Sequence, residues 1–340
     1  MSVDLLNIPF AVITDEHPYA EDYFKSVNIT DFDTELTPNE IISALDDNEL
    51  TENGFSKDQI ASHFIEFIAQ ASMLKQTASR AVESITIIGG QDKSGRKEDM
   101  ELTLVPGDIL CIVGSTGSGK SRLLADIECF AQEDTPTGRT ILVNGKPLIG
   151  EERFRLENKL VAQLSQNMNF VVDMSVGDFI TMHAVSRMIP DIETTVKNVI
   201  ACANDLAGEQ FTPETALTQL SGGQSRALMI ADTALLSSSP VVLIDEIENA
   251  GVDRKKALEL LVQKEKIVLM STHDPILALM GNRRIAIKNG GIAAVMETDD
   301  EEADTLEVLE ILDAKMMDLR QRLRAGERIG FDMKKFFGIK

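Results

Sequence analysis

The segment from residue 108 to residue 126 constrains the fold most, and its centre, residues 114–121, reads GSTGSGKS. An apolar, β-branched run at 109–113 precedes this centre, and a helix-favouring run follows it from 122 to 125. A strand, a glycine-rich turn and a helix in this order are the context of a phosphate-binding loop. The glycines let backbone N–H groups approach phosphate oxygens, and the helix N-terminus adds a positive partial charge. The chain is therefore predicted to bind nucleotide phosphates.

Two side chains of this loop have expected chemical roles. Lys120 is expected to bridge the β- and γ-phosphates, and the Ser121 hydroxyl is expected to ligate Mg²⁺. A chance Gly-Ser loop is the alternative, and the spacing and the flanking elements argue against it. The predicted nucleotide-binding residues of the loop are Gly114, Ser115, Thr116, Gly117, Ser118, Gly119, Lys120, Ser121 and Arg122.

Charge and cysteine usage narrow the class of protein. The formal net charge is −22 over 340 residues, so we expect no nucleic-acid partner, because such binders present basic patches. The three cysteines, Cys111, Cys129 and Cys202, are widely separated, which is typical of a reducing compartment. No apolar run reaches the ~18 residues that a membrane span needs. We expect a cytoplasmic protein, with any membrane association at the inner face through a partner.

The chain divides into three parts. Residues 1–80 form an acidic extension, with 15 acidic against 4 basic residues, which we expect to be small and mainly helical. In it, 10–13 could be a short strand, Thr37-Pro38-Asn39-Glu40 has the form of a capping box, and Ser56 begins a helix with an apolar stripe. Residues 81–297 follow a βαβ pattern, with a helical subdomain at about 167–222.

Residues 298–340 form an acidic linker and a helical tail. Leucines and a methionine recur there at steps of three and four, at Leu309, Leu312, Met316, Leu319 and Leu323. Docking of this seam onto the body is favoured over dimerisation through it, because two heptads are too few for an independent coiled coil. The last segment, 330–340, mixes phenylalanines and lysines; we expect a frayed terminus there rather than a membrane or partner contact.

Two apolar strands end in polar residues. Residues 241–244 are followed by Asp245-Glu246, and residues 267–270 are followed by Ser271-Thr272-His273. Continuous apolar runs of this length fit parallel strands covered by helices on both faces, and such α/β sheets bind ligands at the carboxyl ends of their strands. Asp245 is predicted to hold Mg²⁺ through water, and Glu246 is a candidate general base for the attacking water.

A second glycine-rich segment reads LSGGQ, from Leu220 to Gln224, at the start of a predicted helix. Exposed N–H groups and a positive helix end make it a second anion cradle, with Ser221, Gly222, Gly223 and Gln224 as candidate nucleotide-binding residues. A second cradle is useful if it covers a nucleotide held by another copy. A simple helix N-cap with flexible glycines is the alternative reading of this pentapeptide alone.

Taken together, these motifs resemble those of the ATP-binding cassette (ABC) ATPases, in the same order over residues 82–297. GSTGSGKS resembles the Walker A loop, LSGGQ the family signature, VVLIDE the Walker B strand, 250–253 the D-loop, and STHD the switch with His273. Gln166, 46 residues after Lys120, resembles the Q-loop glutamine, with Gln163 as a competitor. The resemblance implies an α/β fold: a phosphate-loop NTPase core with a mixed sheet, parallel in its core, an antiparallel β subdomain and an inserted helical subdomain.

The resemblance also implies roles for single residues. Gln166 would contact Mg²⁺ and the water, His273 would contact the γ-phosphate, and Ser221 and Gly223 would close over ATP bound to the opposite subunit. Catalysis would thus rest on Glu246, His273, Gln166 and Lys120, and Mg²⁺ on Ser121, Gln166 and Asp245. The expected activity is hydrolysis of ATP to ADP and phosphate at the interface of a head-to-tail dimer, with a second copy or a homologue.

The sequence departs from the family pattern at three places. Walker B continues with Ile247-Glu248-Asn249 instead of a proline, and the D-loop is loose apart from Asp253. No aromatic residue stands in the loop at 87–98, where the family usually stacks adenine, so Ile87 or Ile88 is expected to pack on the base instead. None of the residues needed for hydrolysis is missing, and ATP turnover remains the expectation.

The sequence leaves two classes of protein open for the process that ATP hydrolysis drives. Only 100 residues separate Ser121 from Ser221, which leaves no room for long coiled-coil arms, and no cysteine-rich zinc insertion is present. One class is the nucleotide-binding subunit of a membrane transporter, acting on separate permease subunits, which base rates favour. The other is a soluble ATPase that remodels or assembles a cytosolic metalloenzyme complex, which the acidic extension and the altered motifs favour.

Overall fold

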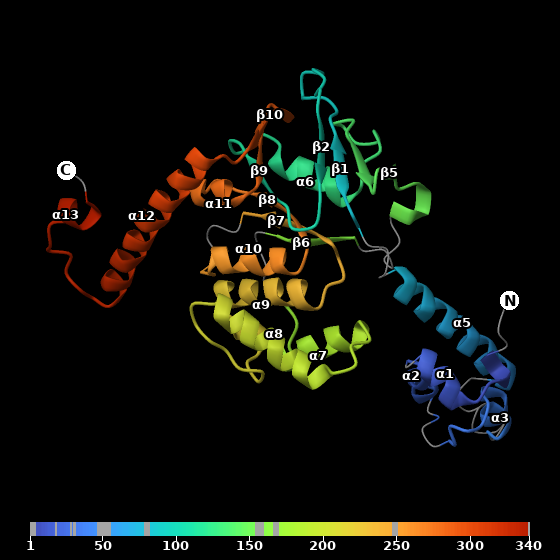
Figure 1. Cartoon of the computed structure of the whole chain (residues 1–340). Helices are drawn as coiled ribbons and strands as arrows, with labels where there is room; N and C mark the ends of the chain where they lie inside the picture. The colour runs from blue at the N-terminus through green and yellow to red at the C-terminus, as the bar shows by residue number, and fades with distance from the viewer. Residues whose placement is uncertain are drawn as a thin grey trace. The chain divides into compact units, whose positions relative to one another are not determined.

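The computed structural model describes residues 5–17, 19–27, 29, 32–45, 56–77, 82–153, 160–165, 170–246 and 251–338. The chain divides into two compact units, Met1–Ala81 and Val82–Lys340 (Figure 1). Among the described residues, no helix combines the length and the apolar character needed to cross a membrane. The first unit contains the short 3₁₀ helix η1 (Leu5–Asn7) and the helices α1 (Phe10–Glu16), α2 (Ala20–Ser26), α3 (Pro38–Ser43) and α5 (Lys57–Thr77).

The core of the first unit is aromatic. Phe10, Phe24 and Phe64 are fully buried, and the rings of Phe10 and Phe24 meet edge to face with centroids 5.2 Å apart. Tyr23 is also buried, and its hydroxyl donates a hydrogen bond to the carbonyl oxygen of Ile60 at 2.9 Å. Burial raises the pKa of this phenol to about 12. The first unit therefore has a hydrophobic core of its own.

The expected strand at 10–13 is wrong, because this segment opens helix α1. Phe10 and Ile13 are both buried, and a spacing of three places them on one face of a helix but on opposite faces of a strand. The expected capping box is confirmed: the Glu40 N–H donates to the Thr37 hydroxyl, and the Thr37 N–H donates to the Glu40 carboxylate.

The second unit contains two sheets. The first has the order β2-β1-β4-β5 and is antiparallel, with β1 (Ile85–Ile88), β2 (Glu101–Leu104), β4 (Thr140–Val143) and β5 (Lys146–Pro147). The second has the order β10-β9-β3-β8-β7-β6, and only β10 runs antiparallel to its neighbour. Its strands are β3 (Ile109–Val113), β6 (Val161–Leu164), β7 (Val241–Asp245), β8 (Ile267–Ser271), β9 (Arg283–Lys288) and β10 (Gly291–Glu297).

The large sheet is covered on both faces. On one face, side chains of β3, β7 and β8 pack with the first sheet and with α6 (Lys120–Glu128). On the other face, they pack with α9 (Gly222–Leu235), α10 (Arg254–Gln263) and α11 (Pro275–Met280). Leu110 and Ile112 of β3 face the first cluster and Cys111 faces the second, as the alternation along a strand requires. This is the predicted parallel core with an antiparallel β subdomain.

A helical segment lies between β6 and α9 in the chain. It consists of α7 (Val176–Ser186), α8 (Ile192–Leu206) and the 3₁₀ helix η4 (Leu217–Gln219), which build a separate apolar cluster with one face of α9. Figure 1 shows α7 and α8 at the opposite end of this unit from the antiparallel sheet. The predicted inserted helices are therefore present.

The tail forms one long helix and one short one. Helix α12 (Asp300–Arg324) packs against α11, and Leu319 of the predicted seam is buried, while Leu323 is 60% exposed. The expectation of a frayed terminus is wrong for residues 333–337, which form α13 (Met333–Phe337). The side chain of Asp332 caps this helix, and Lys315 of α12 lies over the ring of Phe336, 5.9 Å from its centroid. These local contacts order the segment.

Candidate nucleotide site

The phosphate loop joins β3 to α6 as predicted. Gly117 and Gly119 have φ angles of 78° and 113°, in the left-handed region that favours glycine. A Cβ at Gly119 would lie 2.9 Å from the Cα of Gly290, in the turn between β9 and β10. The Gly290 N–H donates to the Ser118 carbonyl oxygen at 2.7 Å. The shape of the loop is therefore fixed from outside by a second turn that packs directly against it.

Lys120 points back into the loop that it follows. Its side chain donates from Nζ to the carbonyl oxygen of Gly114 at 3.0 Å, and Nζ lies 2.9 Å from Nε2 of His273. Lys120 is 6% exposed, whereas Ser121 is exposed at the first turn of α6. An ammonium group held at the mouth of a ring of backbone amides is placed to bind phosphate oxygens.

The ends of β7 and β8 bring the predicted acidic and histidine residues together. Asp245 lies opposite Ser271 in the strand register, and Oε1 of Glu246 lies 3.3 Å from Nε2 of His273. The Thr272 N–H donates to the carbonyl oxygen of Ile112 at 3.1 Å, which ties the switch to the strand before the phosphate loop. Lys120, His273 and Glu246, far apart in sequence, thus meet at one edge of the sheet.

Nε2 of His273 stands between two partners of opposite charge. The ammonium of Lys120 can only donate a hydrogen bond, whereas the carboxylate of Glu246 can only accept one. Nε2 therefore accepts a hydrogen bond from Lys120 when it carries no proton, and donates one to Glu246 when it carries a proton. Glu246 has a φ of 50°, a left-handed conformation that costs a non-glycine residue about 1–3 kcal/mol. The backbone thus holds this carboxylate in a strained position beside the imidazole.

The LSGGQ segment forms the N-terminus of α9. The Ser221 hydroxyl accepts from the Gln224 N–H at 3.3 Å, and the Gln224 side chain accepts from the Ser221 N–H at 2.8 Å, which completes a capping box. The helix-cap reading of this segment therefore describes its geometry within one chain. Ser221 and Gly222 are nevertheless exposed, so the first turn of α9 is open to a second ligand or chain.

Other predicted residues have plainer positions or lie outside the described residues. Gln166, Ala250 and residues 247–249 fall outside them, whereas Gln163 lies in β6 with an exposed side chain. Asp253 caps helix α10 by accepting from the Lys256 N–H at 3.2 Å. The expectation that Ile87 packs on a base is wrong, because Ile87 is fully buried in the core, while Ile88 is half-buried at the strand end.

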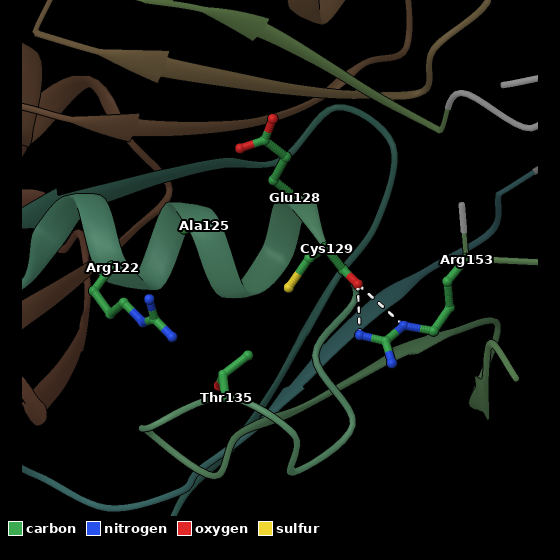
Figure 2. Close-up of a pocket in the computed structure, with 6 residues that line it drawn as sticks. All are labelled: Arg122, Ala125, Glu128, Cys129, Thr135 and Arg153. Atoms are coloured by element: carbon green, nitrogen blue, oxygen red, sulfur yellow. Dashed lines mark hydrogen bonds between the residues drawn. The ribbon is translucent and has the colours of Figure 1, made fainter. Parts of the chain in front are cut away.

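A pocket of about 410 Å³ lies on the flank of α6 (Figure 2). Figure 2 shows that Arg122 points into it, together with Cys129, Thr135 and Arg153. The Arg153 guanidinium donates to the carbonyl oxygen of Cys129, at 3.2 Å from Nε and 2.9 Å from Nη2. The Arg122 side chain is thus directed to this pocket, and its backbone N–H donates to the carbonyl oxygen of Gly119 at 3.1 Å.

A second pocket, of about 540 Å³, opens beside the carboxylate of Glu246. Glu246 and His273 line it from the sheet, and residues of α11 and α12 line the rest, among them Ile276, Leu312 and Met316. Arg254 pairs with Asp274, next to His273, and with Asp313 of α12, 3.1 Å from Nη2. The long tail helix is therefore tied by charge to the switch segment, a contact that no sequence motif indicates.

The second unit also contains a buried cluster of charged residues that no sequence motif indicates. Arg139 is fully buried; Nη1 lies 3.0 Å from Oδ2 of Asp126, and Nη2 lies 2.6 Å from Oε1 of Glu98. Burial alone would raise the pKa of Glu98, but hydrogen bonds from Arg139 and from two backbone N–H groups outweigh it and hold this pKa below its ordinary value. The only sequence signal is one arginine before an apolar strand.

Comparison with known proteins places the chain in a family. The family model described as ABC transporter matches residues 97–249. An uncharacterised ABC transporter ATP-binding protein of Methanocaldococcus jannaschii is 51% identical over 249 residues, 73% of this chain and 95% of that protein. The macrolide export ATP-binding/permease protein MacB of Psychrobacter cryohalolentis is 28% identical over 220 residues, 63% of this chain but 33% of MacB.

The fold comparison agrees with the sequence comparison. The structure of cbiO1 from Clostridium perfringens, titled as part of an ABC transporter complex, has a TM-score of 0.52 at 19% identity, covering 67% of this chain and 93% of that one. At this identity the likeness concerns the fold. The chain belongs to the family of ABC transporter ATP-binding proteins and is an ATPase of that family.

Proposed function

We propose that this chain binds Mg-ATP at the interface of a head-to-tail dimer and hydrolyses it to drive a partner, as the nucleotide-binding subunit of a membrane transporter. The observation that carries the proposal is the meeting of Lys120, His273 and Glu246 at the carboxyl edge of the parallel sheet, beside the phosphate loop. The transporter assignment rests on the family and on the permease-linked relatives that the chain resembles.

Each residue of the site has a role in this proposal. Backbone N–H groups of 114–121 and the Lys120 ammonium bind the β- and γ-phosphates. Glu246 accepts a proton from the attacking water while the water oxygen bonds to the γ-phosphorus. The bond from that phosphorus to the ADP oxygen then breaks. When the phosphates draw Lys120 away from His273, Nε2 is released to hydrogen-bond the γ-phosphate or Glu246. Gln166 would orient the attacking water.

The residues at the strand ends fit a magnesium ion shared with the nucleotide. The Ser271 hydroxyl oxygen, opposite Asp245 in the register, is buried without a hydrogen-bond partner among the described residues, and an ordered water would satisfy it. Ser121, Gln166 and Asp245 would hold the ion, directly or through water. The ion would neutralise negative charge on the phosphates as the phosphate bond breaks.

The signature segment is proposed to complete the site of another subunit. Ser221, Gly222, Gly223 and Gln224 form the N-cap and first turn of α9, in which Ser221 and Gly222 are exposed, and the N–H groups of this turn suit an anion. Gly251 of the D-loop packs against this turn in the same chain, since a Cβ there would lie 3.6 Å from the Cα of Gly223.

The test uses a Glu246→Gln variant of the full chain. Because an amide cannot accept the proton, we expect this variant to bind ATP, to turn it over at least 100-fold more slowly, and to elute as a dimer from gel filtration with ATP and Mg²⁺. Glu265→Gln, at an exposed loop position after α10, is the matched control and should behave as wild type. A variant that stays monomeric with ATP bound would contradict the dimer mechanism.

A second candidate function follows from the separate first unit. The first unit has an aromatic core of its own, and residues 1–80 are strongly acidic. A separate acidic domain of this kind can bind a soluble client protein. In that case the chain would remodel or assemble a cytosolic enzyme complex. Affinity capture from native cells discriminates the two: recovery of an integral membrane permease supports transport, whereas recovery of enzyme subunits from membrane-free extract supports remodelling.

A further inference from the structure

The loop between β1 and β2 lies against the phosphate loop through Lys93. The Lys93 N–H donates to the carbonyl oxygen of Asn289 at 2.9 Å, which joins this loop to the turn between β9 and β10. The alkyl stem of Lys93 packs on Gly290, where a Cβ would lie 2.9 Å from Cγ of the lysine. The ammonium donates to the carbonyl oxygen of Gly117 at 3.3 Å. Lys93 thus reaches the rim of the phosphate loop.

Side-chain hydrogen bonds hold the backbone conformation around Lys93. The Asp92 carboxylate accepts from the Ser94 N–H at 2.7 Å and from the Arg96 N–H at 3.0 Å. The Asn289 amide donates to the Ser94 hydroxyl at 2.8 Å. These bonds fix the turn that carries the lysine, so its position does not depend on the side chain alone. A fixed stem reduces the entropy lost when an ammonium holds an anion.

The buried charge cluster of Arg139 and Glu98 is hydrogen-bonded to the turn between β9 and β10 and to the start of β10. Glu98, at the end of the loop between β1 and β2, accepts from the Ile292 N–H at 2.6 Å and from the Arg139 guanidinium. Arg139 also donates to the carbonyl oxygen of Gly290 at 3.0 Å. Loop, turn and phosphate loop are therefore connected by direct hydrogen bonds, and Lys93 lies where the three meet.

The two lysines of this site differ in what surrounds them. Lys120 is buried, and its ammonium is engaged by Gly114 and His273. Lys93 is exposed, and because an ammonium carries three donors, its bond to Gly117 leaves donors for an incoming anion. A polyphosphate approaching the loop from solvent would meet Lys93 first. No aromatic residue in 87–98 offers a base a stacking partner.

We propose that Lys93 is a second cation of the nucleotide site, which binds the phosphate chain at the rim of the phosphate loop and makes the site select nucleotides by phosphate charge more than by base. This inference rests on the proposed nucleotide-binding function. Its ligand class is a nucleoside triphosphate, with ATP and GTP bound through the same contact.

The experiment is a calorimetric titration of the full chain with ATP and with GTP. Lys93→Met keeps the stem and removes the charge; we expect it to weaken the binding of both nucleotides about tenfold, as for the loss of one charge-assisted hydrogen bond. Lys97→Met removes one charge from an exposed position of the same loop and should change affinity less than twofold. Lys93→Arg keeps the charge and should retain most of the wild-type affinity.

The outcomes separate this inference from the proposed function. A wild-type chain that binds ATP, with a folded Lys93→Met variant that binds it equally well, overturns the role of Lys93 alone. A loss confined to ATP, with GTP binding unchanged, overturns it as well, because the contact would then involve the base. A wild-type chain that binds neither nucleotide overturns the proposed function, and the role of Lys93 with it.

Discussion

At the scale of single residues, the site is a chain of contacts from Lys120 through His273 to Glu246. The imidazole has a carboxylate 3.3 Å away and an ammonium 2.9 Å away, on one nitrogen. The ammonium needs an acceptor and the carboxylate needs a donor, so these two neighbours favour opposite hydrogen-bonding roles of Nε2. In the proposed function, a phosphate that binds Lys120 removes one of them and leaves Nε2 to the other.

The prediction at this scale concerns His273. His273→Ala removes the partner of both Lys120 and Glu246, so we expect kcat for ATP hydrolysis to fall about 100-fold, with KM changed less than threefold. Steady-state phosphate release measures both constants. His63→Ala, at an exposed position of α5 in the first unit, is the control and should leave both unchanged. A rise in KM with kcat intact would place His273 in ATP binding instead of catalysis.

The sequence predicted the residues of this site better than their contacts. Glycine spacing and strand-terminal polar residues predict Lys120, Asp245 and Glu246 as site residues, because the chemistry requires those residue types there, and that role stays a prediction. Lys93 and Arg254 were missed, since nothing in the local pattern distinguishes them from other surface cations. Their positions depend on which loops the fold brings together, and such contacts span about 200 residues for Lys93 and Asn289.

At the scale of elements, the cluster of Arg139, Glu98 and Asp126 joins a loop, helix α6 and the turn between β9 and β10. Removing one partner of a buried ion pair leaves the other charge uncompensated, which costs about 3–5 kcal/mol. We therefore expect Glu98→Gln to lower the free energy of unfolding by about 3 kcal/mol at pH 7. Urea denaturation of the full chain measures it.

The pH dependence of that difference has a defined sign. The pKa of Glu98 is lower in the folded state, so its stabilisation is complete above the unfolded pKa of about 4.5 and is lost as pH falls through the folded value. The gap between wild type and Glu98→Gln should therefore shrink below about pH 4.5. Glu193→Gln, in an exposed pair with Lys197, should show no comparable effect. A gap that does not change with pH would contradict the ionised state of Glu98.

Helix and strand types were predictable where the apolar period was long. Strands β3, β7 and β8 appear at the expected positions, and helices α7 and α8 lie within the helical segment expected at about 167–222, because buried apolar runs and helical stripes are strong signals. Strand β6 was not predicted. The segment at 10–13 failed, since four apolar residues fit either period. Only the burial of Phe10 against Phe24 and Phe64 decides it, and those partners lie elsewhere in the chain.

At the scale of the whole molecule, the two units have separate cores. The first is built on aromatic rings, and the second on the sheets and helices of the ATPase unit. We expect calorimetry of the full chain to show two unfolding transitions, of which Mg-ATP raises only one. A chain lacking residues 1–81 should keep the transition that responds to ATP. A single transition in the full chain would show that the units unfold together.

The position of β3 in the sheet limits the order in which the parts of the chain can fold during synthesis. Its neighbours in the sheet, β8 and β9, begin about 160 residues later in the chain. During synthesis, β3 therefore leaves the ribosome long before β8 and β9 can pair with it, and the face that packs on α9, α10 and α11 stays uncovered until those helices are made. Residues 1–81 emerge before β3, and the described residues of this unit form a core of their own. We expect the acidic first unit to be folded already at this stage, and to keep the nascent ATPase unit soluble by charge repulsion until the sheet closes.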